Sequence, residues 1–363
     1  GENAYRNLVN YRRKLNKKKY ALEGNPASAM YGESQVGKSY LISSLLSADG
    51  IPLCITDDDG VTHNFIEEIN PPGDGSESTS LVTRFSVNYI PVNLKFPIKA
   101  SLLSPTDIVL VLCDSFYNDL KPVHDLSLQT EQINAEIETI KEQFQNRKEQ
   151  QQIIIEDRVL DMKDYFTEYL PKASNVLNSK FFDEISLLIE RAAPIEWKDI
   201  FSILWYRNKK FTALFTQIIT EYQKLNFTNT VYLPLESVLY KNGTLLDAKR
   251  LKEIYEQPDY IESTYKADTP VLCNNQEILV AKSHLCALSA ELIFGLPSTL
   301  VKSKPFLKET DLLDFPGARS RLTLPQNLIE TKIIPELLLR GKVAYLFNKY
   351  SDSEKINALL FCA

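Results

Sequence analysis

The chain has 363 residues, of which 44% are hydrophobic and 24% are charged, and its formal net charge is −6. This length allows two or three domains with a substantial core. Charges of both signs are spread along the chain, which excludes the basic field that nucleic-acid binding requires. No apolar run approaches the roughly 18 residues of a membrane-spanning helix. The five cysteines are scattered and favour reduced thiols, so we expect a cytoplasmic protein.

The N-terminal segment, residues 1–24, is predicted to be a basic helix. Within it, Leu8, Tyr11 and Leu15 recur at helical spacing and form an apolar stripe among lysines and arginines. This helix leads directly to the first predicted strand.

A phosphate-binding motif, G-x-x-x-x-G-K-[ST], follows that strand. The motif lies between the apolar run at residues 26–31 and an amphipathic helix start at 40–46. Strand, glycine-rich turn and helix are the context in which backbone amides cradle phosphates. Lys38 is expected to reach the β- and γ-phosphates, and the Ser39 hydroxyl to hold Mg²⁺. The predicted nucleotide-binding residues are Gly32, Glu33, Ser34, Gln35, Val36, Gly37, Lys38, Ser39 and Tyr40.

A threonine enters a strand soon after this helix, beyond the turn-rich connector at residues 71–75. P-loop GTPases keep switch I at this point, so Thr79 is predicted to coordinate Mg²⁺ and to sense the γ-phosphate. Thr83 is the alternative for this role. The competing interpretation is an ordinary strand entry rich in β-branched residues.

The second half of the predicted nucleotide site is a D-x-P-G motif at residues 314–317, after an apolar strand. Asp314 is predicted to bind a Mg²⁺-bound water, and the Gly317 amide to meet the γ-phosphate. This form is typical of translation-factor-like and dynamin-like GTPases. We therefore predict catalytic roles for Lys38, Thr79, Asp314 and Gly317, and metal ligation by Ser39, Thr79 and Asp314.

Two departures from Ras-like enzymes bear on hydrolysis. Ala318 stands where those enzymes carry a water-orienting glutamine, so hydrolysis would need a backbone group, a cation or an arginine. Arg319 and Arg321 are the candidate arginines, although switch-loop arginines are usually solvated. Gln35 takes the place of a potassium-binding asparagine, which raises the hypothesis of potassium stimulation.

Guanine recognition is not assigned within this sequence. Asn348 and Lys349 begin a pattern close to N-K-x-D, but the aspartate falls one residue late and the surrounding spacing is helical. We interpret them as helix surface and expect the base-reading loop beyond residue 363. The apolar run at residues 356–363 reads as a core strand, so we expect the sequence to be truncated at its C-terminus.

A helical block is predicted at residues 127–226. Ile133, Ile137, Ile140 and Phe144 keep helical spacing, and a second run follows from Ile155 in a shifted phase, which indicates separate or bent helices. We favour mutual packing of these stripes over a membrane-binding face.

Four segments of this sequence resemble the bacterial SrfC-type virulence-factor family. They are residues 32–46, 69–85, 312–319 and 340–347. The resemblance implies a longer bacterial protein with a dynamin-like GTPase head, a helical insertion between switch I and switch II, and further helices after the head. The site residues that it carries over are Lys38, Ser39, Thr79 and Asp314.

Together these features predict an α/β fold: a P-loop NTPase of the TRAFAC, dynamin-like type with a mostly parallel sheet and a large all-helical insertion. The expected domains are the N-terminal helix at 1–24, the G domain at 25–120 and 230–363, and the insertion at 121–229.

The predicted function is Mg²⁺-dependent GTP binding and hydrolysis, driving a conformational or assembly switch. The alternatives are a nucleotide-binding interaction module with negligible hydrolysis, and an ATPase. The expected ligands are GTP or GDP and Mg²⁺, and a second copy or a protein partner would bind the insertion; a membrane role is left open.

Overall fold

The computed structural model describes residues 2–22, 24–33, 36–48, 50–71, 79–121, 126–254, 268–318, 320–326 and 331–362. The chain divides into two compact units. The helical unit comprises residues 1–13, 103–227 and 320–342, and the sheet unit comprises residues 14–102, 228–319 and 343–363.

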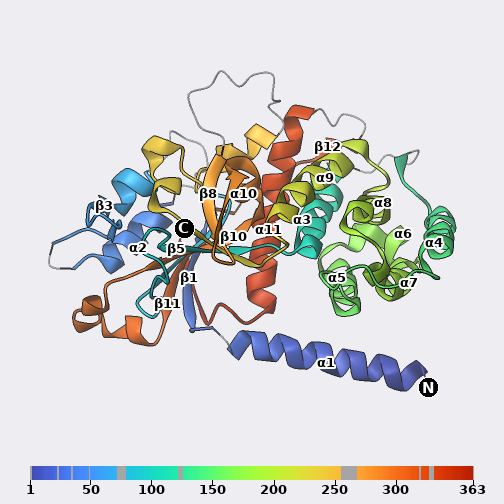
Figure 1. Ribbon diagram of the computed structural model, residues 1–363, viewed down its shortest axis with the longest axis horizontal. Helices are drawn as coiled ribbons and strands as arrows, with labels where there is room; N and C mark the ends of the chain where they lie inside the picture. The colour runs from blue at the N-terminus through green and yellow to red at the C-terminus, as the bar shows by residue number, and fades with distance from the viewer. Residues whose placement is uncertain are drawn as a thin grey trace. The chain divides into compact units, whose positions relative to one another are not determined.

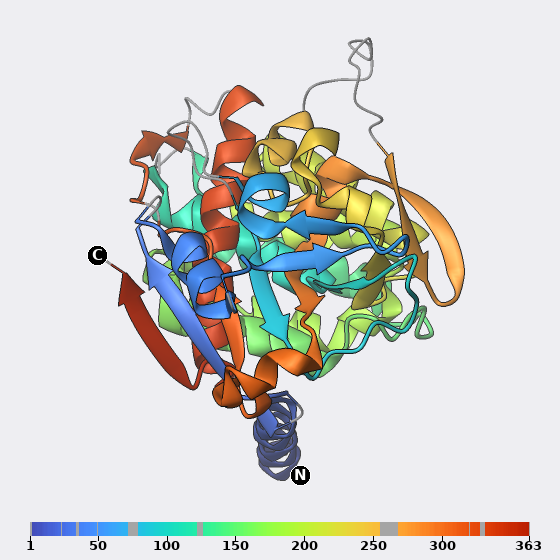
Figure 2. The ribbon, with the colours of Figure 1, turned by 90° about the vertical axis from the view of Figure 1, so that its left-hand side faces the viewer.

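The sheet unit is built on a nine-stranded sheet with the order β13-β1-β11-β4-β10-β5-β7-β8-β9. Its strands are β1 (Ala27–Gly32), β4 (Val82–Ser86), β5 (Ile98–Leu102), β7 (Thr230–Leu233), β8 (Asp268–Cys273), β9 (Gln276–Ala281), β10 (Ser289–Gly295), β11 (Asp311–Asp314) and β13 (Ala358–Cys362). Figure 2 shows β13, in dark red, beside β1, in blue, at one edge of this sheet. A separate hairpin is formed by β2 (Cys54–Thr56) and β3 (Thr62–Asn64).

The sheet is mixed, so the expectation of a mostly parallel sheet is wrong. β1 runs parallel to β11 and to β13, and β4 runs parallel to β10, whereas the other five pairings of this sheet's described strands are antiparallel. One reason is the turn between β8 and β9, where Asn274 and Asn275 have φ of 48° and 63°. A two-residue turn with positive φ at both positions reverses the chain into a hairpin, and parallel pairing needs a long crossover instead.

Short helices complete the sheet unit around an aromatic core. Phe65, Phe85 and Phe294 are buried, and their ring centroids lie 5.0 to 5.9 Å apart, in edge-on and stacked arrangements. The helices are α2 (Lys38–Leu46), the π-helix η1 (Phe65–Ile69), η7 (Leu235–Ser237), η8 (Tyr240–Asn242), η9 (Ala248–Ile254), α10 (Lys282–Leu288), η11 (Ser298–Lys302) and η12 (Pro305–Lys308).

The helical unit contains the expected helical block. Its α-helices are α3 (Pro105–Asn118), α4 (Thr130–Phe144), α5 (Glu156–Tyr169), α6 (Ser174–Leu177), α7 (Phe181–Leu188), α8 (Trp197–Phe201) and α9 (Lys209–Lys224), and α11 (Ile334–Asp352) contributes its residues up to 342. Short 3₁₀ turns join them: η3 (Pro171–Ala173), η4 (Ile189–Arg191), η5 (Pro194–Glu196), η6 (Ser202–Trp205) and η14 (Thr331–Ile333). Two short strands, β6 (Leu120–Lys121) and β12 (Leu324–Pro325), pair within the same unit. Figure 1 shows α4 to α8, in green, gathered together.

The apolar stripes of this block pack internally, as the sequence predicted. Ile133, Ile137, Ile140 and Phe144 on α4 are all buried, as are Val159, Met162 and Phe166 on α5. The polar stretch between the two runs separates α4 from α5, so they are two helices and not one coiled coil. A face used for mutual packing is not available to a membrane.

The helical unit begins earlier in the chain than the boundary expected at residue 121. It takes α3 from Leu103 onward, together with residues 320–342. Every residue from Pro105 to Tyr117 is buried, as in a helix that is enclosed in a protein core. Within this unit α3 contacts α5 and α9.

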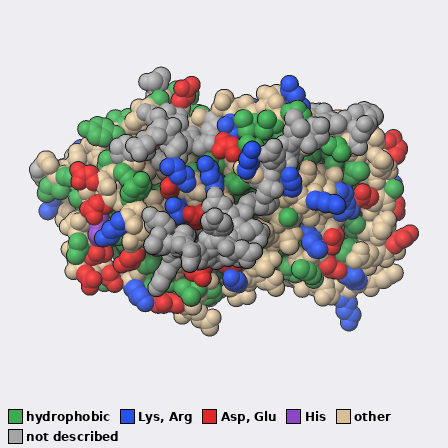
Figure 3. Space-filling model, turned by 90° about the horizontal axis from the view of Figure 1, so that it is seen from above, with side chains coloured by type: hydrophobic (Ala, Val, Ile, Leu, Met, Phe, Trp, Pro, Cys, Tyr) green, Lys and Arg blue, Asp and Glu red, His purple; other side chains and the backbone are tan. Residues whose placement is uncertain are grey.

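The chain begins with one long helix, α1 (Glu2–Leu22). Within the ranges that the structure describes, no helix combines the length and the apolar character needed to cross a bilayer. On the face drawn in Figure 3, lysines and arginines are interspersed with aspartates and glutamates, in keeping with the mixed charge of the sequence.

Candidate functional site

The glycine-rich loop has the predicted strand–loop–helix setting. β1 ends at Gly32 and α2 begins at Lys38, with Gly37 as its N-cap at φ +88°. A residue with a side chain is strained at this φ, so glycine is required for the chain to turn into α2. Ser34 and Gln35, which the sequence predicts to contact phosphate, lie outside the described residues.

Gly32 is required for a different reason, a close approach between strands. A Cβ atom at this position would lie 2.1 Å from the carbonyl oxygen of Cys362 on β13. The backbone at the start of the loop therefore lies in close contact with the edge strand β13. This contact determines where the loop leaves the sheet.

Lys38 holds its ammonium group inside this loop. Its side chain is only 7% exposed, and Nζ donates to the carbonyl oxygens of Gly32 at 3.1 Å and Glu33 at 2.5 Å. These hydrogen bonds hold the positive charge of Lys38 next to the backbone of the loop. This is where a phosphate-binding lysine is expected.

The parallel pairing of β1 with β11 brings the two predicted motifs together. Met30 is in register with Asp314, so both strands end at the same edge of the sheet. Beyond that edge, Glu33 and Ala318 form a parallel bridge, and the Ala318 amide donates to the Gly32 carbonyl at 3.0 Å. The two loops therefore run side by side, and Gly317 is buried next to this bridge.

Ser39 and Asp314 are in direct contact across these loops. The Ser39 hydroxyl donates a hydrogen bond to Oδ2 of Asp314. Asp314 is 5% exposed, and its other oxygen, Oδ1, is buried without a hydrogen-bond partner in the described structure. Burial raises the pKa of Asp314 to about 6, although the hydrogen bond from Ser39 and the charge of Lys38 both lower it.

This donor set fits a magnesium ion. Hydroxyl and carboxylate oxygens are hard ligands, and Mg²⁺ in nucleotide sites keeps several waters while binding only one or two protein oxygens. The orphaned Oδ1 of Asp314 is an acceptor that a metal-bound water would satisfy. Among the described residues, no three His, Cys, Asp or Glu side chains cluster as a metal site.

Asn70 also belongs to this site, and the sequence analysis missed it. It follows η1, is buried, and donates from Nδ2 to the Ser39 hydroxyl oxygen at 3.2 Å. With Asn70 as donor and Asp314 as acceptor, the direction of the Ser39 hydroxyl is determined. The available signal was an isolated polar residue after the apolar Ile69, in a segment that also carries the family resemblance.

The two threonine candidates lie in different places. Thr79 forms an antiparallel bridge with Asp247 just before β4, and Thr83 lies on β4 directly opposite Asp314 in the sheet register. Neither hydroxyl is hydrogen-bonded to Ser39 or Asp314 in the described structure. The residues from 72 to 78, which precede Thr79, are outside the described ranges.

The remaining candidates are also accounted for. Tyr40 is exposed on α2. Arg319 is outside the described residues, and Arg321 pairs with Asp114 at 2.6 Å and Asp119 at 3.3 Å within the helical unit. Asn348 and Lys349 lie within α11, as expected from their helical spacing.

These features define an α/β protein with a large mixed sheet and a glycine-rich loop beside a buried carboxylate. Residues 3–363 match the family described as "Putative bacterial virulence factor". Because this match covers nearly the whole sequence, the chain belongs to that family. No match is found among curated proteins.

Proposed function

We propose that the sheet unit binds GTP with Mg²⁺ and hydrolyses it slowly, as the head of a dynamin-like GTPase. The observation that carries this proposal is the hydrogen bond from Ser39 to Oδ2 of Asp314. The second carboxylate oxygen, Oδ1, is buried without a hydrogen-bond partner in the described structure. The hydrogen bond joins the metal-binding hydroxyl of one motif to the carboxylate of the other. Ligands of open α/β sheets bind outside the carboxyl ends of parallel strands, and both motifs follow such ends.

Each residue would have a separate role in binding. The amides of the loop and of the first turn of α2 would receive the phosphates. Lys38 would turn from the loop carbonyls toward the β- and γ-phosphates. Mg²⁺ would be held by Ser39 and, through water, by Asp314, where it neutralises charge on the phosphates. Asn70 would orient Ser39 so that its oxygen lone pair faces the metal.

Turnover is expected to be slow. Ala318 lacks a group that could orient water, and its amide is already bonded to the Gly32 carbonyl. Arg321 is engaged by two aspartates. Residues 103–227 lie in sequence between Thr79 and Asp314, so a nucleotide-dependent movement of either segment would pull on the helical unit. This is the basis for a conformational or assembly switch.

The direct test is a titration of the protein with GTP, GDP and ATP in the presence of Mg²⁺, in which calorimetry measures the binding affinity of each nucleotide. Micromolar binding of guanine nucleotides and at least tenfold weaker binding of ATP would support the proposal. Lys38→Ala should lose binding, whereas Lys95→Ala, an exposed lysine of the same unit, should bind normally. Equal binding by the Lys38→Ala variant would contradict the proposal, and a preference for ATP would make the protein an ATPase.

A second candidate, a nucleotide-binding interaction module without turnover, is favoured by Ala318. Release of labelled phosphate from GTP distinguishes the two. Phosphate release that Asp314→Asn abolishes supports the enzyme, and tight GTP binding with no release above the buffer blank supports the module. Asn70→Ala should weaken binding in Mg²⁺ but not in EDTA, because the described hydrogen bond of the Asn70 side chain is to the metal-binding hydroxyl.

A further inference from the structure

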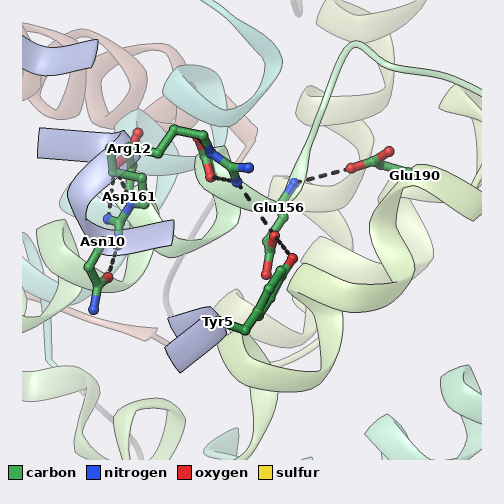
Figure 4. A network of polar contacts seen from close by, with 8 residues as sticks. Tyr5, Asn10, Arg12, Glu156, Asp161 and Glu190 are labelled. Carbon is green, nitrogen blue, oxygen red and sulfur yellow. Dashed lines mark hydrogen bonds and ion pairs between the residues drawn. The ribbon is translucent and has the colours of Figure 1, made fainter. Parts of the chain in front are cut away.

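The first part of the N-terminal helix α1, up to Arg13, belongs to the helical unit and is anchored there by one face. Val9 is 3% exposed and Arg13 is 8% exposed, and Arg13 pairs with Asp161 at 2.8 Å and Asp164 at 2.5 Å. Figure 4 shows Tyr5 and Arg12 of this helix beside Glu156 on α5, to which the Tyr5 hydroxyl donates a hydrogen bond. Arg12 also bonds to Asp157 on α5. The anchored face therefore combines the buried Val9 with ion pairs of Arg12 and Arg13, and it occupies one side of the helix.

The opposite side of α1 carries large apolar residues that the described structure leaves uncovered. Leu8, Tyr11 and Leu15 are each 67% exposed, and Leu22 is 86% exposed. At about 100° per residue these four fall within an arc of roughly 60°, away from Val9 and Arg13. Removing such apolar side chains from water is favourable, so these exposed residues favour contact with a partner.

The spacing of these residues is that of a coiled-coil seam. Leu8, Leu15 and Leu22 are seven residues apart, as a positions are, and Tyr11 falls at a d position between them. A membrane-surface helix needs a wider apolar face, whereas a narrow stripe with an apolar residue at every a position fits one facing helix. The narrow stripe therefore favours a helical partner over a lipid surface.

The charges beside the seam indicate the chemistry of that partner. Lys14 and Lys19 flank the stripe at the g and e positions, and Lys18 takes the d position between Leu15 and Leu22. In coiled coils the e and g charges select the partner and repel a like-charged one. A parallel second copy of α1 would place lysine against lysine, which disfavours self-pairing.

We propose that the outer stripe of α1 is a docking surface for an amphipathic helix of a partner protein that carries Asp or Glu at its flanking positions. Leucine-rich contacts supply affinity, and Lys14 and Lys18 supply selectivity. This proposal is independent of nucleotide binding.

The test uses the whole chain and two fluorescent four-heptad peptides with Leu at a and d. One peptide carries Glu at e and g, and the other carries Lys there. Anisotropy should show micromolar binding of the Glu peptide, weakening as salt is raised, and no binding of the Lys peptide. Leu15→Glu should weaken binding at least tenfold. Asn16→Glu, the same charge change at the exposed neighbouring position, should leave affinity within twofold.

Circular dichroism of both variants checks that the total helix content is unchanged. Equal binding of the two peptides, or unchanged binding by the Leu15→Glu variant, would refute the proposal. Sedimentation that shows a dimer abolished by Leu15→Glu would assign the stripe to a second copy instead. Binding to phosphatidylserine vesicles without binding to the Glu peptide would assign it to a membrane, and either result overturns the proposal.

Discussion

The hydroxyl of Ser39 donates a hydrogen bond to Oδ2 of Asp314, although the two residues are 275 positions apart in sequence. The bond joins the first turn of α2 to the end of β11. It leaves one carboxylate oxygen of Asp314 buried and unpartnered in the described structure. The contact therefore joins the phosphate-loop motif to the D-x-P-G motif. It also holds the carboxylate of Asp314 in a buried position, where burial disfavours the charged form.

The first prediction concerns the stability of the nucleotide-free protein. Because burial raises the pKa of Asp314 from 3.8 to about 6, the fold favours the protonated carboxyl. Its contribution to stability is fully present below pH 3.8 and is lost as the pH rises through about 6. Asp314→Asn should then be more stable than the wild type at pH 7.5, by up to about 3 kcal/mol.

Urea unfolding at pH 7.5 and pH 5.0, without nucleotide, measures this difference in unfolding free energy. The advantage of Asp314→Asn should shrink at pH 5.0, because the wild-type carboxyl is then largely protonated. Asp58→Asn, which changes an exposed aspartate, is the control for the loss of one carboxylate. An Asp314→Asn variant that is less stable at both pH values would mean that the carboxylate is well compensated.

The second prediction is a pH dependence centred on His63. Nε2 of His63 lies 3.0 Å from Asp57 and Nδ1 lies 2.9 Å from Glu68. Burial alone would lower the pKa of His63, but the two carboxylates outweigh it and raise the pKa above 6.5. The stabilisation is therefore present below pH 6.5 and is lost as the pH rises through the higher folded value.

Thermal unfolding of the wild type and of His63→Gln across pH 5.5 to 8.5 checks this dependence. The wild type should be the more stable protein at pH 5.5, and its advantage should decline toward pH 8.5. His284→Gln serves as the control for loss of a histidine elsewhere. A difference in Tm that does not vary with pH would show that His63 acts only through packing.

The third prediction separates the two loop glycines from an unconstrained one. Gly32→Ala places a methyl group against the Cys362 carbonyl, and Gly37→Ala strains a residue at φ +88°. Each should lower the free energy of unfolding by about 1–3 kcal/mol. Gly24→Ala, with nothing within 4 Å of the added carbon, should cost no more than about 0.5 kcal/mol. Urea unfolding ranks the three, and equal effects would mean that the loop backbone adjusts freely.

The fourth prediction concerns a buried ion-pair network inside the sheet. Arg84 on β4 pairs with Glu291 at 3.1 Å and with Asp311 at 3.0 Å, and the Tyr350 hydroxyl donates to Glu291 at 2.7 Å. Arg84→Met leaves two buried carboxylates without their cation and should cost about 3–5 kcal/mol. Lys95→Met, which breaks the exposed pair with Glu277, should cost less than about 1 kcal/mol. Chemical denaturation of both variants measures the contrast, and similar losses would indicate that water relieves the buried pair.

Local patterns in the sequence determined the parts of the molecule whose hydrogen bonds and periodicity are local. The strand, turn and helix around Lys38 could be predicted because apolar runs and glycines specify their own backbone conformation. The stripes of α4 and α5 could be predicted because helical spacing places one face inward wherever the helix lies. The membership of Asn348 in a helix followed from the same spacing.

The tertiary structure alone decided which distant residues meet. Asn70 donates a hydrogen bond to Ser39, and Arg321 forms ion pairs with Asp114 and Asp119. The path of the chain brings these residues together, and no local pattern in the sequence encodes that path. Strand direction depends on the same long-range path, so the mixed sheet was not predictable from its strands one by one. The sequence determined which pieces form, because their conformations depend on neighbouring residues. Their pairing depends on burial and charge between segments far apart in the chain, and only the folded structure decided it.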